Sequence, residues 1–175
     1  MKKRIIAVNQ YAHETKNFEG ASDEFLEETA PLIGYIVHSF NTLEELLNSA
    51  ICELFFDDYD GYGLQIIYKR TYADKVDLFK RVLLDHGCHK KIPIFEKLIS
   101  NLSEAGELRN LVIHADWESA HVDGYTLCKL KINTRGIQHE YVQFTVESLE
   151  NILTLINDTC DMFYQYNDEW QELYR

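Results

Sequence analysis

The most regular pattern of apolar residues lies in the first third of the chain. From residue 22 to about residue 56, apolar side chains recur at steps of three and four, the spacing that places them on one face of an α-helix. Pro31 has two interpretations, because it can open the main part of this helix or kink it. The pattern predicts one long amphipathic helix whose apolar positions are Ile33, Val37, Phe40, Leu43, Leu47, Ile51, Leu54 and Phe55.

The middle of the chain predicts a break followed by two more helices. Residues 63–70 follow a stretch rich in Asp and Gly and contain a β-favouring run, which indicates a loop or a short extended piece. Thr71 and Asp74 resemble a capping box that opens a helix ending near Gly87. Pro93 suits the first turn of the next helix. The expected inward positions are Val76, Phe79, Val82 and Leu83 on the first of these helices, and Phe95, Leu98, Ile99, Leu102, Ala105, Leu108 and Val112 on the second.

The pattern changes between residues 124 and 146. Two partly alternating stretches flank Asn133-Thr134-Arg135-Gly136, which is a turn sequence, so this region predicts a β-hairpin. Helical spacing returns from residue 148 to residue 173, at Leu149, Ile152, Ile156, Cys160, Phe163 and Trp170. We therefore expect a mainly α fold, a bundle of about four to five helices with a β-hairpin inserted before the last helix. Since no repeat or linker divides the chain, residues 1–175 are interpreted as a single domain.

Net charge limits the partners that the chain can have. A formal charge of -12 argues against a general nucleic-acid coat, which needs many cations against phosphates. Residues 61–100, however, contain eight basic and four acidic side chains. This local excess is either a solvated helix face or a surface for an anionic ligand such as RNA. The candidate RNA contacts there are Lys69, Arg70, Lys90 and Lys91.

Cysteine spacing and hydropathy indicate the setting of the protein. Its four cysteines form no CxxC pair, and its N-terminal apolar run is shorter than a signal-peptide core. No stretch approaches the roughly 18 apolar residues of a membrane span. We expect a cytoplasmic protein that does not associate with membranes.

Three familiar enzyme motifs are absent from the sequence: it has no phosphate-binding glycine loop, no GxSxG elbow and no HExxH helix. Two short sets of potential metal ligands, His86-Gly87-Cys88-His89 and His114, Asp116 and His121, lack a second pair at fixed spacing, so we expect no metal and no cofactor. The aromatic residues of the last helix are a base-stacking platform or, by the simpler interpretation, core or dimer contacts. They are Tyr164, Tyr166, Trp170 and Tyr174.

One segment has residues suited to chemistry, Arg109-Asn110-Leu111-Val112-Ile113-His114. With about 100° per residue, Asn110 and His114 lie about 40° apart on a helix and share a face. Arg109 is about 140° from His114, but its long side chain can reach past the flank. The alternative is structural, because Arg and Asn at a helix C-terminus can bind the last carbonyls and a His there interacts with the helix dipole.

The Arg-Asn-x-x-x-His spacing of this segment resembles the RNxxxH motif of HEPN-domain proteins. Asn41-Thr42-Leu43-Glu44 in the first helix, Lys75 at the start of a middle helix, and His114-Ala115-Asp116-Trp117 after the motif resemble uncharacterised bacterial members of that group. The resemblance implies a compact helical bundle and metal-independent RNA cleavage through attack of the 2′-hydroxyl on the adjacent phosphate. It also implies a homodimer in which two motifs form one composite site, in a toxin or phage-defence effector for which an antitoxin can exist.

Within that resemblance each motif residue has a chemical role. An imidazole with a pKa of about 6.5 is suited to proton transfer, so His114 is the candidate acid or base. Arg109 offers a planar cation that matches phosphate oxygens, and Asn110 would orient the substrate or His114. A different class of function is also open: a non-catalytic dimeric helical module that binds nucleotide, RNA or a protein partner.

Overall fold

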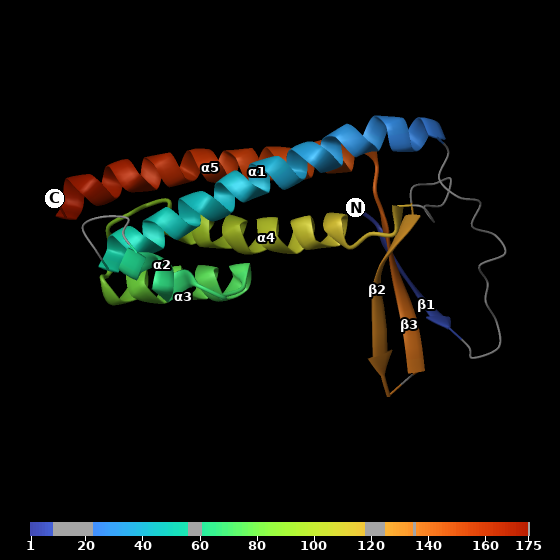
Figure 1. Ribbon diagram of the computed structural model, residues 1–175, viewed down its shortest axis with the longest axis horizontal. Helices are drawn as coiled ribbons and strands as arrows, with labels where there is room; N and C mark the ends of the chain where they lie inside the picture. Colours follow the sequence, from blue (N-terminus) through green and yellow to red (C-terminus); the bar gives the residue numbers. More distant parts are fainter. Residues whose placement is uncertain (9–22, 56–60, 118–124, 135, 175) are drawn as a thin grey trace. The chain divides into compact units, whose positions relative to one another are not determined.

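The computed structural model of the chain describes residues 1–8, 23–55, 61–117, 125–134 and 136–174. Within these ranges the chain is mainly α, with five α-helices, one short 3-10 helix and a β-hairpin before the final long helix (Figure 1), as the sequence predicted. In chain order the elements are β1 Lys3–Val8, α1 Asp23–Phe55, α2 Gly61–Ile67, α3 Tyr72–Asp85, η2 Cys88–Lys90, α4 Phe95–Ile113, β2 Tyr125–Asn133, β3 Gly136–Gln143 and α5 Val146–Tyr174.

The contacts of the chain divide it into two compact units. One unit consists of Met1–Val37 and Leu108–Leu153 and contains the strands, and we call it the sheet unit. The other consists of His38–Glu107 and Thr154–Arg175 and is helical, and we call it the helical unit. Helices α1, α4 and α5 each contribute a segment to both units. The boundaries between the two units therefore fall inside these three helices. The expectation that residues 1–175 form a single domain stays a prediction.

The sheet unit is built on a three-stranded antiparallel sheet with the order β1-β3-β2. The hairpin β2–β3 was predicted, and its strands meet at Asn133 and Gly136, where Gly136 has a φ of 97° that favours glycine. Strand β1 was not predicted. It pairs with β3 from Lys3 opposite Val142 to Val8 opposite Ile137, a pairing between segments far apart in the sequence. The pattern of apolar residues in a short N-terminal segment does not indicate that it pairs with β3.

Helix α5 enters the sheet unit through a reciprocal cap. Thr145 N–H donates to Ser148 Oγ at 2.8 Å, and Ser148 N–H donates to Thr145 Oγ1 at 3.1 Å. The cap satisfies two backbone donors that have no partner inside the helix. The core of the sheet unit then combines residues of the sheet with the adjoining ends of the helices, at Ile36, Leu111, Val112, Cys128, Val142, Phe144, Leu149 and Ile152.

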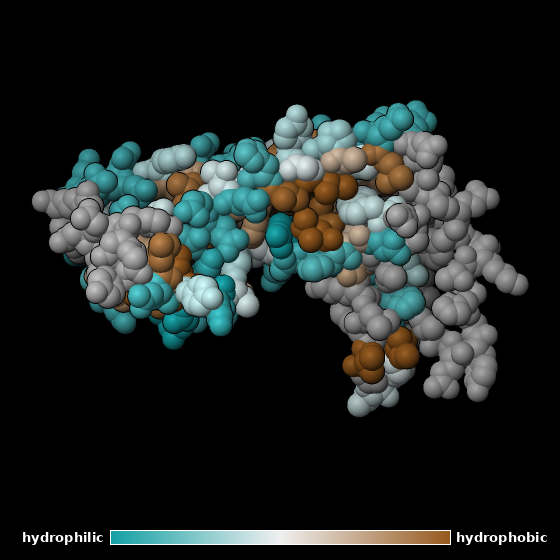
Figure 2. Space-filling view, in the orientation of Figure 1, coloured by the Kyte–Doolittle hydropathy of each residue, from teal (hydrophilic) through white to brown (hydrophobic). Residues whose placement is uncertain are grey.

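An apolar pair lies at the end of the hairpin. Ile132 and Ile137 are directly opposite each other in the ladder and are 76% and 39% exposed. Figure 2 shows brown, hydrophobic atoms at this end of the hairpin. The two side chains therefore add apolar surface at the turn and little to the core.

The helical unit is held by an aromatic and aliphatic core. The ring of Phe79 on α3 lies 5.7 Å from that of Phe163 and 5.4 Å from that of Tyr166, both on α5. Helix α1 contributes a buried stripe at steps of three and four, as predicted. Its fully buried members in this unit are Phe40, Leu43, Leu47, Ile51 and Cys52, and those of α4 are Phe95, Leu98, Leu102 and Ala105.

Some details of α1 differ from the prediction. Pro31 lies inside the helix, which begins at Asp23, so it does not open the helix. Ile36 is fully buried although we did not predict it, whereas Ile33 and Val37 are half-buried and Phe55 is 43% exposed. The prediction therefore holds from Phe40 to Ile51 and fails towards the two ends of the helix, because the helix wheel alone does not identify the packing partners.

The expectation of a loop or extended piece at residues 63–70 is wrong, because Gly61–Ile67 form helix α2. Gly63 and Ile67 are one helical turn apart and are both buried, while Leu64 and Gln65 between them are exposed. A Cβ added to Gly63 would lie 2.9 Å from Cys52 Sγ, so glycine allows close approach of α2 to α1. Tertiary packing here outweighs the β-preference of the local sequence.

Helix α3 follows its sequence signals closely. Thr71 and Asp74 form the predicted capping box: Asp74 N–H donates to Thr71 Oγ1, and Thr71 N–H donates to Asp74 Oδ2, each at 3.2 Å. The Thr71 hydroxyl also donates to Asp74 Oδ2 at 2.7 Å, and this bond, together with the one from Thr71 N–H, holds the pKa of Asp74 below its usual value. The helix ends at Asp85 and is followed by Gly87 with a φ of 72°.

Candidate functional site

The Arg109–His114 motif occupies the end of α4, within the sheet unit. The helix ends at Ile113, and the backbone N–H of His114 still donates to Asn110 O at 3.1 Å. His114 is therefore placed one helical turn after Asn110. Both residues are exposed and Arg109 is half-buried, so the shared face of Asn110 and His114 predicted from the helical wheel is accessible to solvent.

The structure brings Arg109 to this face. Its Nη1 donates a hydrogen bond to Asn110 Oδ1 at 3.1 Å. Because the side-chain oxygen of Asn110 accepts from Arg109, the amide NH₂ of Asn110 remains a donor for a ligand. The flanking position on the wheel is thus bridged by the length of the Arg side chain. Within the described part of the chain, no hydrogen bond or ion pair joins the His114 ring to Arg109 or Asn110.

A planar cation, an amide and an imidazole within about one helical turn suit one kind of ligand. The guanidinium and amide donors match phosphate or carboxylate oxygens. The exposed imidazole of His114 is a side chain of the kind that transfers protons in general acid–base catalysis. The arrangement can therefore bind an anion and transfer one proton, which is half of what acid–base cleavage of a phosphodiester requires.

The chain after the motif is fixed by Trp117. Its indole Nε1–H donates to Val112 O at 3.0 Å, and its ring centroid lies 5.0 Å from that of Phe144 and 6.5 Å from that of Phe25. Burial raises the pKa of Tyr141 on β3, and the negative charge of Asp116, just before Trp117, adds to this rise. The carbonyl of Val112, near the helix C-terminus, is thus capped by Trp117. The sequence did not predict this role, because Trp117 lies beyond the end of the helix, where helical spacing no longer relates it to Val112.

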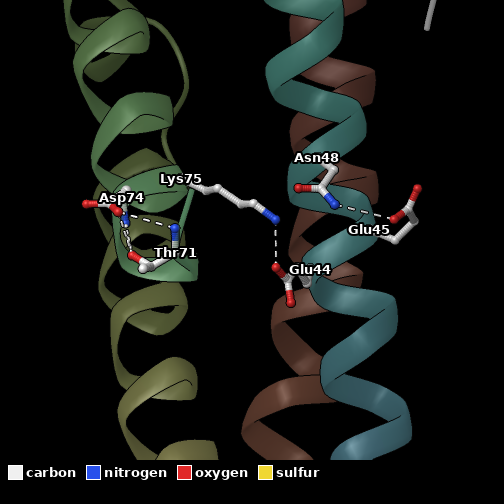
Figure 3. A network of polar contacts seen from close by, with 6 residues as sticks. All are labelled: Glu44, Glu45, Asn48, Thr71, Asp74 and Lys75. Atoms are coloured by element: carbon white, nitrogen blue, oxygen red, sulfur yellow. Dashed lines mark hydrogen bonds and ion pairs between the residues drawn. The ribbon is translucent and has the colours of Figure 1, made fainter. Parts of the chain in front are cut away.

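A second polar cluster lies in the helical unit (Figure 3). Lys75 of α3 reaches Glu44 of α1, with 2.7 Å between Lys75 Nζ and Glu44 Oε1. The side chain of Lys75 is 10% exposed and that of Glu44 is 30% exposed. These two residues lie far apart in the sequence, and the resemblance to HEPN proteins included both. Their contact ties α3 to α1.

Tyr72, which is half-buried, adds a hydrogen-bonded hydroxyl to this second cluster. Its OH donates to Leu102 O at 3.1 Å, and its ring centroid lies 4.7 Å from that of Phe40. Burial, together with the negative charge of Glu44, raises the pKa of Tyr72 well above the usual value. The cluster is closed: its groups bind one another and the backbone, and the hydroxyl stays protonated as a donor.

The candidate RNA contacts are all exposed but do not converge. Lys69 and Arg70 precede α3, whereas Lys90 and Lys91 follow it. The two pairs are separated along the chain by α3, a helix of 14 residues that is about 20 Å long. Lys69 has a φ of 60°, and its Nζ lies 5.3 Å from the centroid of the Tyr68 ring. Elsewhere in the stretch, Lys75 pairs with Glu44 and Arg81 with Asp77, which reduces the charge available to a ligand.

Neither of the two candidate sets of metal ligands forms a metal site among the described residues. Over the described residues, no group of three or more His, Cys, Asp and Glu side chains is arranged to hold a metal ion. Cys88 is buried and His86 packs edge-on against Trp170, while His121 lies outside the described residues.

In the last helix, Tyr166 is 2% exposed and contacts Phe79, Phe163 and Trp170. Tyr166 therefore belongs to the core and not to a base-stacking platform.

Comparison of the chain with models of known protein families, with curated proteins and with solved structures finds no significant match. The hypothesis for the motif therefore depends on its residues and their geometry. In the described helices, no segment is both long enough and apolar enough to cross a bilayer.

Proposed function

We propose that the protein is a metal-independent endoribonuclease of the HEPN type, with Arg109, Asn110 and His114 as its site. The observation that carries the proposal is the exposed end of α4, where Arg109 binds Asn110 and His114 follows one turn later. Phosphate recognition and proton transfer are thereby available on one accessible face.

The proposed reaction needs only side chains and the RNA itself. The 2′-oxygen attacks the adjacent phosphorus and gives up its proton to an imidazole acting as a base. The bond from phosphorus to the 5′-oxygen breaks, and that oxygen takes a proton from an imidazole acting as an acid. The products are a 2′,3′-cyclic phosphate and a 5′-hydroxyl. Arg109 stabilises the additional negative charge on the phosphoryl oxygens, and Asn110 orients the phosphate through its amide.

A homodimer is part of this proposal. One imidazole cannot readily act as acid and base in the same step, and the described motif contains a single His. A two-fold axis would place the His114 residues of two copies on either side of one phosphate. The acidic balance of the chain favours exposed single-stranded loops over duplexes as substrates, since loops present bases for recognition and depend less on phosphate contacts. A role as toxin or phage-defence effector, with an antitoxin as partner, belongs to the same proposal.

Cleavage of structured RNAs in EDTA tests the proposal. We expect His114→Ala to reduce the rate at least about 100-fold, the usual contribution of general acid–base catalysis. His38→Ala, at an exposed histidine in the helical unit, is the matched control and should leave the rate unchanged. Product ends should be 2′,3′-cyclic phosphates.

Equal activity in wild type and His114→Ala, or no cleavage of any RNA by wild type, would contradict the proposal. RNA, nucleotide or protein binding that survives both Arg109→Ala and His114→Ala would then favour the non-catalytic helical module.

A further inference from the structure

The C-terminal turn of a helix is its least constrained part. The last four carbonyls lack intrahelical donors, and such ends fray unless another group binds them. His114 lies one residue beyond the end of α4, so its position relative to Asn110 depends on whether this turn stays closed.

Two hydrogen bonds close the turn. The N–H of His114 donates to Asn110 O at 3.1 Å, and the indole N–H of Trp117 donates to Val112 O at 3.0 Å. The second bond ties the Trp117 side chain back to the last turn of the helix. Val112 is fully buried, which excludes water as an easy substitute donor and makes an unmade bond to its carbonyl costly.

The ring of Trp117 is itself fixed from two sides. It packs at 5.0 Å from Phe144, which directly follows β3 and is fully buried, and at 6.5 Å from Phe25 of α1. An indole held by packing donates its hydrogen bond with little further loss of rotamer freedom. The hairpin inserted before α5 thus supplies, through Phe144, the support for the helix end that carries the motif.

We infer that Trp117 is a positioning residue that holds His114 one turn after Asn110 by capping Val112 O. Its effect on catalysis rests on the proposed ribonuclease function, whereas its effect on the position of His114 does not. Trp117 acts through the backbone carbonyl of Val112, so its proposed role is to position His114 and not to react.

Amide hydrogen exchange in Trp117→Phe, measured by NMR, tests the inference without any substrate. Phenylalanine preserves the packing ring and removes the N–H. We expect the His114 amide to exchange about fivefold faster, the change that corresponds to loss of one net hydrogen bond, while amides of the helical unit keep their rates. Trp170→Phe, at the only other tryptophan, is the matched control and should leave the His114 amide unchanged. An unchanged His114 amide in Trp117→Phe overturns the inference.

A second variant separates positioning from general stability. Phe144→Leu weakens the packing beneath Trp117 and keeps its N–H, so it should lower the melting temperature and raise exchange across the sheet unit as a whole. If Trp117→Phe gives this same uniform pattern, its role is only structural and the inference is wrong.

Kinetics give the readout that depends on the proposed function. In a wild type that cleaves RNA, Trp117→Phe should lower kcat about tenfold with KM within about twofold, because the reacting imidazole is displaced while phosphate binding is retained. An unchanged kcat overturns the positioning role. In a wild type that cleaves no RNA the proposed function fails, and the exchange of the His114 amide still decides whether Trp117 holds the turn.

Discussion

The two polar clusters of this protein use similar residue types in opposite ways. Lys75 is buried and Glu44 is half-buried, and they bind each other at 2.7 Å, next to a tyrosine hydroxyl that is hydrogen-bonded to the backbone. Arg109, Asn110 and His114 lie at a helix end, where Asn110 and His114 are exposed. A closed cluster contributes to stability and specificity of packing, whereas an open one keeps donors and a titratable ring available to a ligand. The difference predicts that the first cluster affects folding and the second affects function.

The largest effect on stability is expected from breaking the closed pair. Lys75→Met leaves Glu44 partly buried without its cation, and we expect a loss of about 2 kcal/mol in the free energy of unfolding. This is below the range for fully buried pairs because the Glu44 side chain is 30% exposed. Urea denaturation measures the loss. The double variant Lys75→Met/Glu44→Gln should recover part of it, and a loss below about 0.5 kcal/mol in the single variant would mean that the cluster is not closed in solution.

A smaller loss is expected from Gly106→Ala on α4. A Cβ at this position would lie 2.7 Å from Cε1 of the Tyr72 ring, which is rigid and held by its hydrogen bond to Leu102 O. The helix preference for Ala over Gly is worth about 1 kcal/mol in the stabilising direction. Overpacking costs about 1–3 kcal/mol and should exceed it, so we expect a net loss of about 1 kcal/mol in thermal denaturation. Gly34→Ala on α1, where an added Cβ meets nothing within 4 Å, is the control and should be stabilising.

Tyr72→Phe should cost about 1 kcal/mol, the net value of one hydrogen bond, and it also tests the pH dependence. The folded pKa of Tyr72 is raised, so its contribution is fully present below the unfolded value near 10 and is lost as pH rises above that value. Wild type should therefore lose stability more steeply than Tyr72→Phe above pH 10. Parallel stability curves for the two proteins would show that the hydroxyl is not buried in solution.

The smallest effects on stability are expected at the open cluster. Asn110→Ala and His114→Ala remove exposed side chains, and we expect changes within about 0.5 kcal/mol by urea denaturation. A loss greater than about 1 kcal/mol in either variant would give the motif a structural role and would remove the contrast with Lys75 and Glu44.

Sequence patterns predicted the parts of this fold that depend on local periodicity. The long helices, the Thr71 capping box and the hairpin turn at Gly136 follow from spacing and turn chemistry, which neighbouring residues determine. Strand β1 depends on a partner more than a hundred residues away, and helix α2 depends on close packing of Gly63 against Cys52. Neither signal exists within a short window of sequence.

In the candidate site, too, the features set by local spacing were predicted and those set by tertiary contacts were not. Helical geometry predicted that Asn110 and His114 share a face. The length of the Arg109 side chain indicated that it can reach that face from the flank. The hydrogen bond from Trp117 to Val112 O and the pairing of Lys75 with Glu44 required the tertiary structure, because each joins positions that no repeat relates. The proposed catalytic activity and the dimer depend on the resemblance of the motif and on the experiments above.

The four cysteines give each unit its own chemical reporter. Cys128 is buried in the sheet unit, and Cys52, Cys88 and Cys160 are buried in the helical unit. Burial raises the pKa of Cys160 to about 11, so its thiolate is scarce at neutral pH while the protein is folded. The rate at which each thiol is alkylated then reports how often the structure around it opens. Mass spectrometry of a labelling time course would compare opening rates of the two units in one sample of unmodified protein.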